Sequence, residues 1–99
     1  MLPGDTAAAA RALLAVPAAA RPALCRRIFA GAAAAAAHMA RRRALHPCWG
    51  DGSLSAAARR FPLADEPFLD HPEYLACTRL VLSTLAARIG NNPVSPPAR

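Results

Sequence analysis

The sequence predicts a small all-α protein: a bundle of about four helices with one long helical hairpin and no sheet. Alanine occupies 27 of the 99 positions and all twelve basic residues are arginine, so strong helix formers dominate the chain. Runs of β-branched residues are almost absent, and apolar residues recur at helical spacing rather than in alternation. The length allows a single domain, which we place at residues 1–90.

Two helices are predicted in the N-terminal half of the chain. The first covers residues 7–16, with Asp5 or Thr6 as its N-cap. The second begins near Pro22, because proline is favoured in the first helical turn, and reaches about residue 44. Its apolar residues form a stripe made of Leu24, Ile28, Ala32, Ala35 and Met39. Since alanine leaves this face nearly flat, we expect another helix, of this chain or of a second copy, to pack tightly there.

The C-terminal half contains a short predicted helix over residues 54–60, capped by Ser53, and a longer one that ends at Gly90. Asp70 and Glu73 are spaced as a capping box at the start of the longer helix. This helix is expected to direct the following side chains toward the core: Tyr74, Thr78, Val81, Leu82, Leu85 and Ile89. Residues 91–99 contain three prolines and are predicted to form a disordered tail.

Core size and charge both point to a binding partner. Apart from alanine and cysteine, only about two dozen apolar side chains are available for burial, which is marginal for a lone domain. Residues 1–43 hold seven arginines against Asp5, a net charge of +6, whereas five arginines balance five acidic residues in residues 44–99. This asymmetry suggests an acidic partner or a nucleic-acid backbone.

Two arginine clusters are the strongest functional signal in the sequence. They are Arg26 with Arg27, and Arg41, Arg42 and Arg43. On one helix, a separation of fifteen residues places the clusters at broadly similar azimuths and roughly 22 Å apart. Guanidinium groups at this spacing can donate paired hydrogen bonds to phosphates of a nucleic acid or to carboxylates of an acidic protein. A merely solvated face is the alternative interpretation.

The loop Trp49-Gly50-Asp51-Gly52-Ser53 is interpreted as structural, with Trp49 as a buried plug and Ser53 as the cap of the next helix. Two alternatives stay open: exposed backbone N–H groups that bind an anion, and a loop that docks on a partner.

No enzyme or metal site is expected. Ser53 does not lie in a G-x-S-x-G motif, and no histidine has an aspartate partner at motif level. His46, Cys48 and His71, with Cys77 as a fourth group, lack the paired spacing of a zinc site. We therefore expect no catalytic residue, no cofactor, no metal and no small-molecule substrate.

The sequence also favours a cytoplasmic protein. Cys25, Cys48 and Cys77 are odd in number and scattered, which is typical of reduced thiols. The apolar segment 28–40 is shorter than the roughly 20 residues needed to span a bilayer. Arg11 and Pro17 interrupt the apolar N-terminal segment, so we expect no secretory signal and no membrane association.

The run from Leu45 to Leu54, an HPxWGDGSL-type loop between an Arg-rich helix and a short Ala-rich one, resembles a loop in a group of short bacterial proteins. These proteins are rich in alanine and arginine, and the positions of Glu66-Pro67 and Tyr74 fit the same resemblance, which covers residues 5–88. It implies a small helical family without an assigned activity, and it transfers no site residues.

We therefore expect a non-enzymatic interaction or adaptor module that self-associates or docks on a larger protein, with an exposed stripe from Leu24 to Met39 as its binding face. The alternative is a DNA-handling accessory protein, similar in size, helicity and charge to small subunits of phage-type DNA-packaging machines. Such a protein should gather both arginine clusters on one surface. An enzyme should instead show a pocket that holds His46 or His71 beside Ser53, Asp51 or Cys48.

Overall fold

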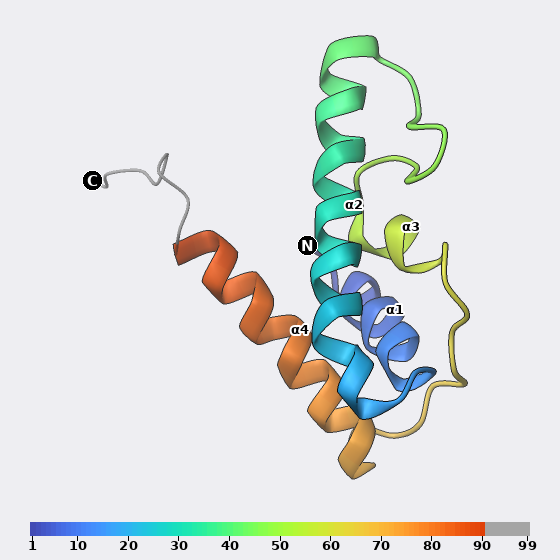
Figure 1. The fold of residues 1–99 in the computed structure, drawn as a ribbon, viewed down its shortest axis with the longest axis vertical. Coiled ribbons are helices and arrows are strands. Elements are labelled where there is room, and N and C mark those ends of the chain that lie inside the picture. The colour runs from blue at the N-terminus through green and yellow to red at the C-terminus, as the bar shows by residue number, and fades with distance from the viewer. Residues whose placement is uncertain (91–99) are drawn as a thin grey trace.

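The computed structural model describes residues 1–90 and consists of four α-helices and one turn of 3₁₀ helix (Figure 1). In chain order the elements are α1 (Pro3–Leu14), η1 (Ala18–Ala20), α2 (Arg21–Arg42), α3 (Leu54–Ala58) and α4 (Pro72–Gly90). No strand occurs in these ninety residues, and an isolated antiparallel bridge joins His46 to Gly50. The all-α prediction is confirmed. The predicted tail, residues 91–99, lies outside the described residues.

Helix α1 lies at the centre of the bundle and is buried on almost every side. It packs mainly against α4 and α3, and also against α2. Its innermost side chains expose 2% or less of their surface: Ala8, Ala9, Ala10, Ala12 and Leu13. Because these side chains are mostly methyl groups, the neighbouring helices can approach α1 closely. The other helices contribute the larger core residues: Cys25, Ile28, Phe29, Leu54, Tyr74, Cys77 and Val81.

The first helix begins four residues earlier than predicted, at Pro3, because proline is well suited to the first helical position. Asp5 is therefore the third residue of α1 and not its N-cap. Asp5 is 8% exposed, and its carboxylate accepts the backbone N–H of Leu2 through Oδ2 at 2.9 Å. Through Oδ1 it accepts the backbone N–H of Ser55, also at 2.9 Å. One buried carboxylate thus binds N–H groups at the start of both α1 and α3, where negative charge is stabilising.

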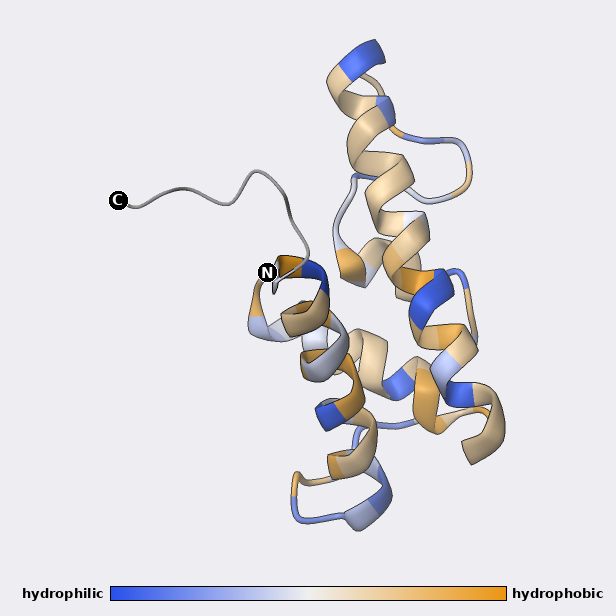
Figure 2. Ribbon diagram, turned by 60° about the vertical axis from the view of Figure 1, so that its left-hand side comes forward, coloured by the Kyte–Doolittle hydropathy of each residue, from blue (hydrophilic) through white to orange (hydrophobic). Residues whose placement is uncertain are grey.

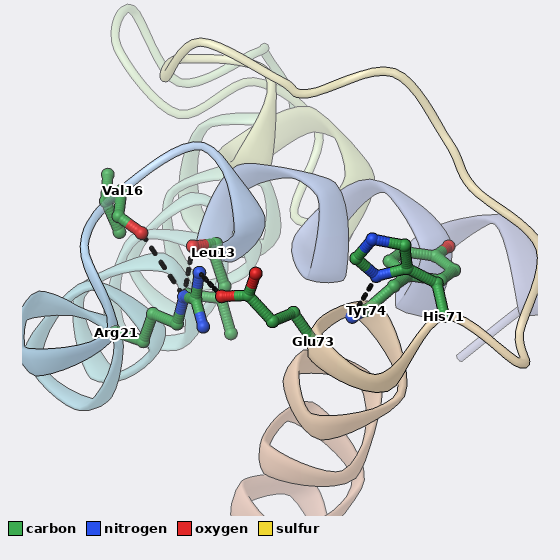
Figure 3. A network of polar contacts seen from close by, with 6 residues as sticks. All are labelled: Leu13, Val16, Arg21, His71, Glu73 and Tyr74. Atoms are coloured by element: carbon green, nitrogen blue, oxygen red, sulfur yellow. Dashed lines mark hydrogen bonds and ion pairs between the residues drawn. The ribbon is translucent and has the colours of Figure 1, made fainter.

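Arg21, the first residue of α2, satisfies the opposite end of α1 (Figure 3). Its Nε donates to the carbonyl oxygens of Leu13 at 2.9 Å and Val16 at 3.2 Å. Its Nη2 lies 3.3 Å from Oε2 of Glu73 in the first turn of α4. The Arg21 side chain, only 12% exposed, therefore caps α1 and joins the starts of α2 and α4.

The predicted capping box at Asp70 and Glu73 is wrong. Pro72 takes the first helical position of α4, so the N-cap is His71, whose Nδ1 accepts the backbone N–H of Tyr74 at 3.3 Å. Glu73 does not reach back to the cap, since its carboxylate pairs with Arg21. Figure 3 shows both contacts at this end of the bundle.

Replacing Asp5 should destabilise the whole bundle, because Asp5→Ala leaves the N–H groups of Leu2 and Ser55 without their acceptor. We expect the free energy of unfolding to fall by about 2–3 kcal/mol in urea titrations followed by circular dichroism. Asp65→Ala is the matched control, since Asp65 is exposed, and it should change stability by less than about 0.5 kcal/mol. Equal effects of the two substitutions would contradict the role given to Asp5.

Candidate interaction surface

The segment between α2 and α3 folds back over the second half of α2. Arg43 ends α2 in the left-handed conformation, with φ of 54°. His46 then organises the turn: its Nδ1 accepts the backbone N–H groups of Cys48 and Trp49, each at 3.0 Å. Because Nδ1 accepts both hydrogen bonds, the ring proton of the neutral imidazole lies on Nε2. The main chains of His46 and Gly50 close the turn with two further hydrogen bonds of 2.8 and 3.2 Å.

Trp49 packs directly on the backbone of α2. A Cβ atom added to Gly31 would overlap the indole atoms Cδ2 and Cε3, so the ring occupies the space that any larger residue would need. The Trp49 ring also lies 6.0 Å from the Phe61 ring, between centroids, and the Arg27 guanidinium lies 5.4 Å above Phe61. Trp49 is half-buried and not fully buried as predicted, but it fastens the loop to α2 through this contact.

The remaining loop residues build the start of α3. Gly50 and Gly52 adopt φ values of 84° and 95°, which favour glycine. The Asp51 carboxylate accepts the backbone N–H of Ser53 at 2.9 Å, and hydrogen bonding to Ser53 lowers the pKa of Asp51. Ser53 caps α3 as predicted, with its Oγ accepting the N–H of Ala56 at 3.1 Å. Since Asp5 and Ser53 occupy donors at the start of α3, these contacts support the structural interpretation of the loop.

The stripe expected to bind a partner largely faces the core of its own chain. Ile28 and Ala35 are fully buried and Ala32 is 8% exposed, while Leu24 and Met39 are half-buried. Helix α2 packs against α3, α1 and α4 of the same chain. The expectation that Leu24 to Met39 forms an exposed docking face therefore needs correction, and the tightly packed neighbour is intramolecular.

The two arginine clusters do not converge on one surface. Arg27 turns toward Phe61, whereas Arg26 lines a hollow with residues of α4, so the first cluster is divided between two sides of α2. Arg41, Arg42 and Arg43 are exposed at the far end of the helix, which Figure 2 shows as a hydrophilic tip. None of these three takes part in an ion pair within residues 1–90, where Arg21–Glu73 is the pair present.

Histidine and cysteine residues are dispersed among the described residues. The rings of His38 and His46 meet edge to face, 5.1 Å between centroids, near the arginine tip. Desolvation, with the charges of His46, Arg42 and Arg41, lowers the pKa of His38. No group of three metal-ligating side chains forms within residues 1–90. The hollow beside Ser53 is lined partly by Asp5 and Arg88, and neither His46 nor His71 contributes to it.

Helix α4 carries two parallel rows of side chains with different surroundings. The inner row faces the bundle and consists of Tyr74, Cys77, Val81 and Thr84. The outer row follows one residue later, about 100° further round the helix, and consists of Leu75, Thr78, Leu82, Leu85 and Ile89. Leu85 is half-buried and packs against the edge of the core, as predicted. Leu75, Leu82 and Ile89 expose 41%, 48% and 62% of their surface. The prediction that Leu82 and Ile89 point into the core is wrong.

A groove borders the outer row. It has a volume of about 360 Å³ and is lined by the start of α1, the segment before α4 and α4 itself: Pro3, Thr6, Ala7, Glu66, Leu69, Tyr74, Thr78 and Leu82. Leu69, which is 60% exposed, extends the apolar surface to one side. The Tyr74 hydroxyl donates a hydrogen bond to Oε2 of Glu66 at 3.3 Å. Burial and, to a smaller extent, the negative charge of Glu66 raise the pKa of Tyr74, so the hydroxyl stays protonated and can donate this bond.

The spacing of the outer row was a signal available in the sequence. Its residues are separated by three, four, three and four positions, the repeat of a helix that packs along a partner helix. The inner row repeats this spacing one residue earlier, so the spacing shows that α4 has two such rows and does not show which one is covered. Hydrophobicity alone favours the burial of Leu82 and Ile89 over that of Cys77 and Thr84.

Within residues 1–90, the fold and this surface define a small all-α bundle in which α4 exposes an apolar face. The chain belongs to the family described as a domain of unknown function, DUF7742, which it matches over residues 1–85. This match confirms the expected membership of a family without an assigned activity. No curated protein and no solved structure matches the chain. Within the described residues, no helix combines the length and apolar character needed to cross a membrane.

The contact between Trp49 and Gly31 can be tested by Gly31→Ala, which should displace the indole. We expect a loss of about 1–3 kcal/mol in stability and a red shift of the fluorescence of Trp49, the single tryptophan. Gly4→Ala is the control, because a Cβ atom at Gly4 meets nothing within 4 Å.

In a Trp49→Ala background, Gly31→Ala should instead stabilise the protein by up to about 1 kcal/mol, since alanine is the better helix former. Destabilisation by Gly31→Ala that persists without the indole would show that the contact is not the cause.

Proposed function

We propose that this protein is a non-enzymatic interaction module that binds another protein surface through the outer row of α4. The observation that carries the proposal is the exposure of Leu75, Leu82 and Ile89 on one helix face, beside an apolar groove. Exposed apolar patches on small proteins are commonly binding sites. Since the stripe on α2 packs against helices of its own chain, we place the binding face on α4.

The charge around this face also favours a protein partner. In residues 68–90, Asp70 and Glu73 balance Arg79 and Arg88, so the net charge is zero in a protein of charge +6. Arg88 turns away from the outer row, with its guanidinium 5.5 Å above the Phe29 ring. An apolar surface with little charge at its centre is typical of protein–protein interfaces.

The three cysteines are unpaired, and Cys25 and Cys77 are buried. Burial raises the pKa of both thiols and keeps them protonated and unreactive. We infer a reducing, cytoplasmic environment, which these free thiols support.

The proposal can be tested by placing the photo-crosslinking residue p-benzoylphenylalanine at position 82 or at position 45 in expressing cells. Leu45 is the matched control, since it is a leucine that is 65% exposed on the loop after α2. We expect discrete light-dependent protein adducts from position 82 and none from position 45. Equal labelling from the two positions would reject the outer row as a binding face.

A second candidate function, binding to a nucleic-acid backbone, is favoured by the arginine tip of α2. Arg41, Arg42 and Arg43 are adjacent, exposed and free of ion pairs within residues 1–90. The division of Arg26 from Arg27 reduces the extent of this surface, so we place the function second.

Fluorescence anisotropy with a short DNA duplex tests this candidate. Replacing Arg41, Arg42 and Arg43 by alanine should weaken binding and reduce the slope of log K against log salt by about 2–3. The control replaces Arg59, Arg60 and Arg79, which removes the same charge elsewhere. Equal losses in the two variants would indicate attraction by net charge and no specific contact at the tip.

A further inference from the structure

We infer that the partner of the outer row is a second copy of this chain, with two α4 helices packed antiparallel about Leu82. This inference rests on the proposed function and names its partner. Four properties of the described residues lead to it: the spacing of the row, the shape of the surface beside it, the distribution of charge, and the exposed apolar area.

The spacing of the outer row allows it to pack against the same row of a second copy; we call this contact the seam. Intervals of three and four residues suit side chains that interlock between two helices crossing at a shallow angle. Leu82 lies midway between Leu75 and Ile89, so a two-fold axis at Leu82 sets each Leu75 against the Ile89 of the other copy. Thr78 fits this seam because its hydroxyl already donates to the carbonyl of Tyr74 at 3.0 Å, which leaves its methyl group for the interface.

Each molecule has both a projecting end of α4, at Ile89, and a groove beside the other half of α4. The C-terminal half of α4 diverges from α2 (Figure 1), and Ile89 near its end is the most exposed member of the outer row. The groove lies at the other half of α4, where Leu69, Tyr74 and Thr78 line it. In the antiparallel arrangement, the Ile89 end of each copy reaches the groove side of the other. The contact is therefore symmetric and closes at two copies.

The helix dipoles favour the antiparallel direction. Each copy carries a net charge of +6, so two copies repel one another whichever way α4 runs. Arg41, Arg42 and Arg43 lie at the end of α2 and not on the outer row, so the apolar contact itself is free of this cluster. Increasing salt should strengthen this association by screening the repulsion, which is opposite to its effect on nucleic-acid binding.

The exposed apolar side chains form a group on and beside α4. Leu69, Leu75, Leu82 and Ile89 expose between 41% and 62% of their surface. A standard interface buries about 800 Å² per partner and has an apolar centre surrounded by polar residues. These four side chains can supply the apolar centre of such an interface.

The first experiment measures the mass of the full chain in solution by sedimentation equilibrium. We expect the wild-type protein to associate to twice its mass of 10.3 kDa. Leu82→Glu, present in both copies of the symmetric contact, should raise the dissociation constant roughly 100-fold or more. Leu45→Glu should leave it unchanged. Circular dichroism of Leu82→Glu should retain the wild-type helical signal, because Leu82 lies outside the core, and a dimer unaffected by Leu82→Glu would overturn the inference.

Cysteine cross-linking tests the direction. In a Cys48→Ser background, which removes the exposed thiol, Leu82→Cys should form a disulfide-linked dimer under mild oxidation. Leu75→Cys and Ile89→Cys should each cross-link poorly alone and efficiently when the two variants are mixed. Efficient cross-linking of Leu75→Cys with itself would show a parallel pair and overturn the antiparallel arrangement.

The two proposals fail in different ways. A specific dimer with a dissociation constant of about 10 nM would be fully formed at a protein concentration of about 100 µM, which is ten thousandfold higher. A wild-type protein that stays monomeric at this concentration would therefore reject the second copy as the partner. If position 82 still gave light-dependent adducts with larger proteins, the interaction module would stand with a different partner. If position 82 gave no adducts, both proposals would fall.

Discussion

The burial of α1 on almost every side is the constraint on which the rest of the structure depends. A helix has unpaired N–H groups at one end and unpaired carbonyl groups at the other, and inside a bundle these need partners from the protein. Asp5 supplies the acceptor at the first end and Arg21 the donor at the second. Because Asp5 also binds α3 and Arg21 also binds Glu73, the side chains that complete α1 position every other helix.

A central helix of alanine lets its neighbours pack close to it. Methyl groups bring the helices together, and Tyr74, Cys77 and Val81 are the α4 side chains that are buried there. Close packing also occurs on α2, where the indole of Trp49 occupies the space that a side chain at Gly31 would need. On α4 the row of Cys77 and Val81 faces the bundle, so Leu75 and Leu82 lie on the exposed side of the helix.

The helices, the cap at Ser53 and the packing of Trp49 against its own chain were predictable because they depend on local spacing and residue type. The two incorrect caps, at Asp5 and Asp70, both precede or follow a proline whose preference for the first helical position decided the boundary. The outer row could not be identified from spacing alone, since the inner row has the same period one residue earlier. Only the position of α1 decides which row is covered, and that position depends on contacts between residues far apart in the sequence, such as Asp5 with Ser55.

The arginine cluster and the apolar outer row lie on different helices, and this separation affects what each surface can bind. Arg41, Arg42 and Arg43 lie at the end of a 22-residue helix, while the outer row lies on a segment without net charge. If the apolar face lay beside the arginine tip, repulsion between copies would oppose its burial. With the face on α4, two copies can pair while both tips stay exposed and free to meet an anionic surface. The proposed self-association through α4 and the proposed backbone binding at the tip therefore use separate surfaces of one molecule.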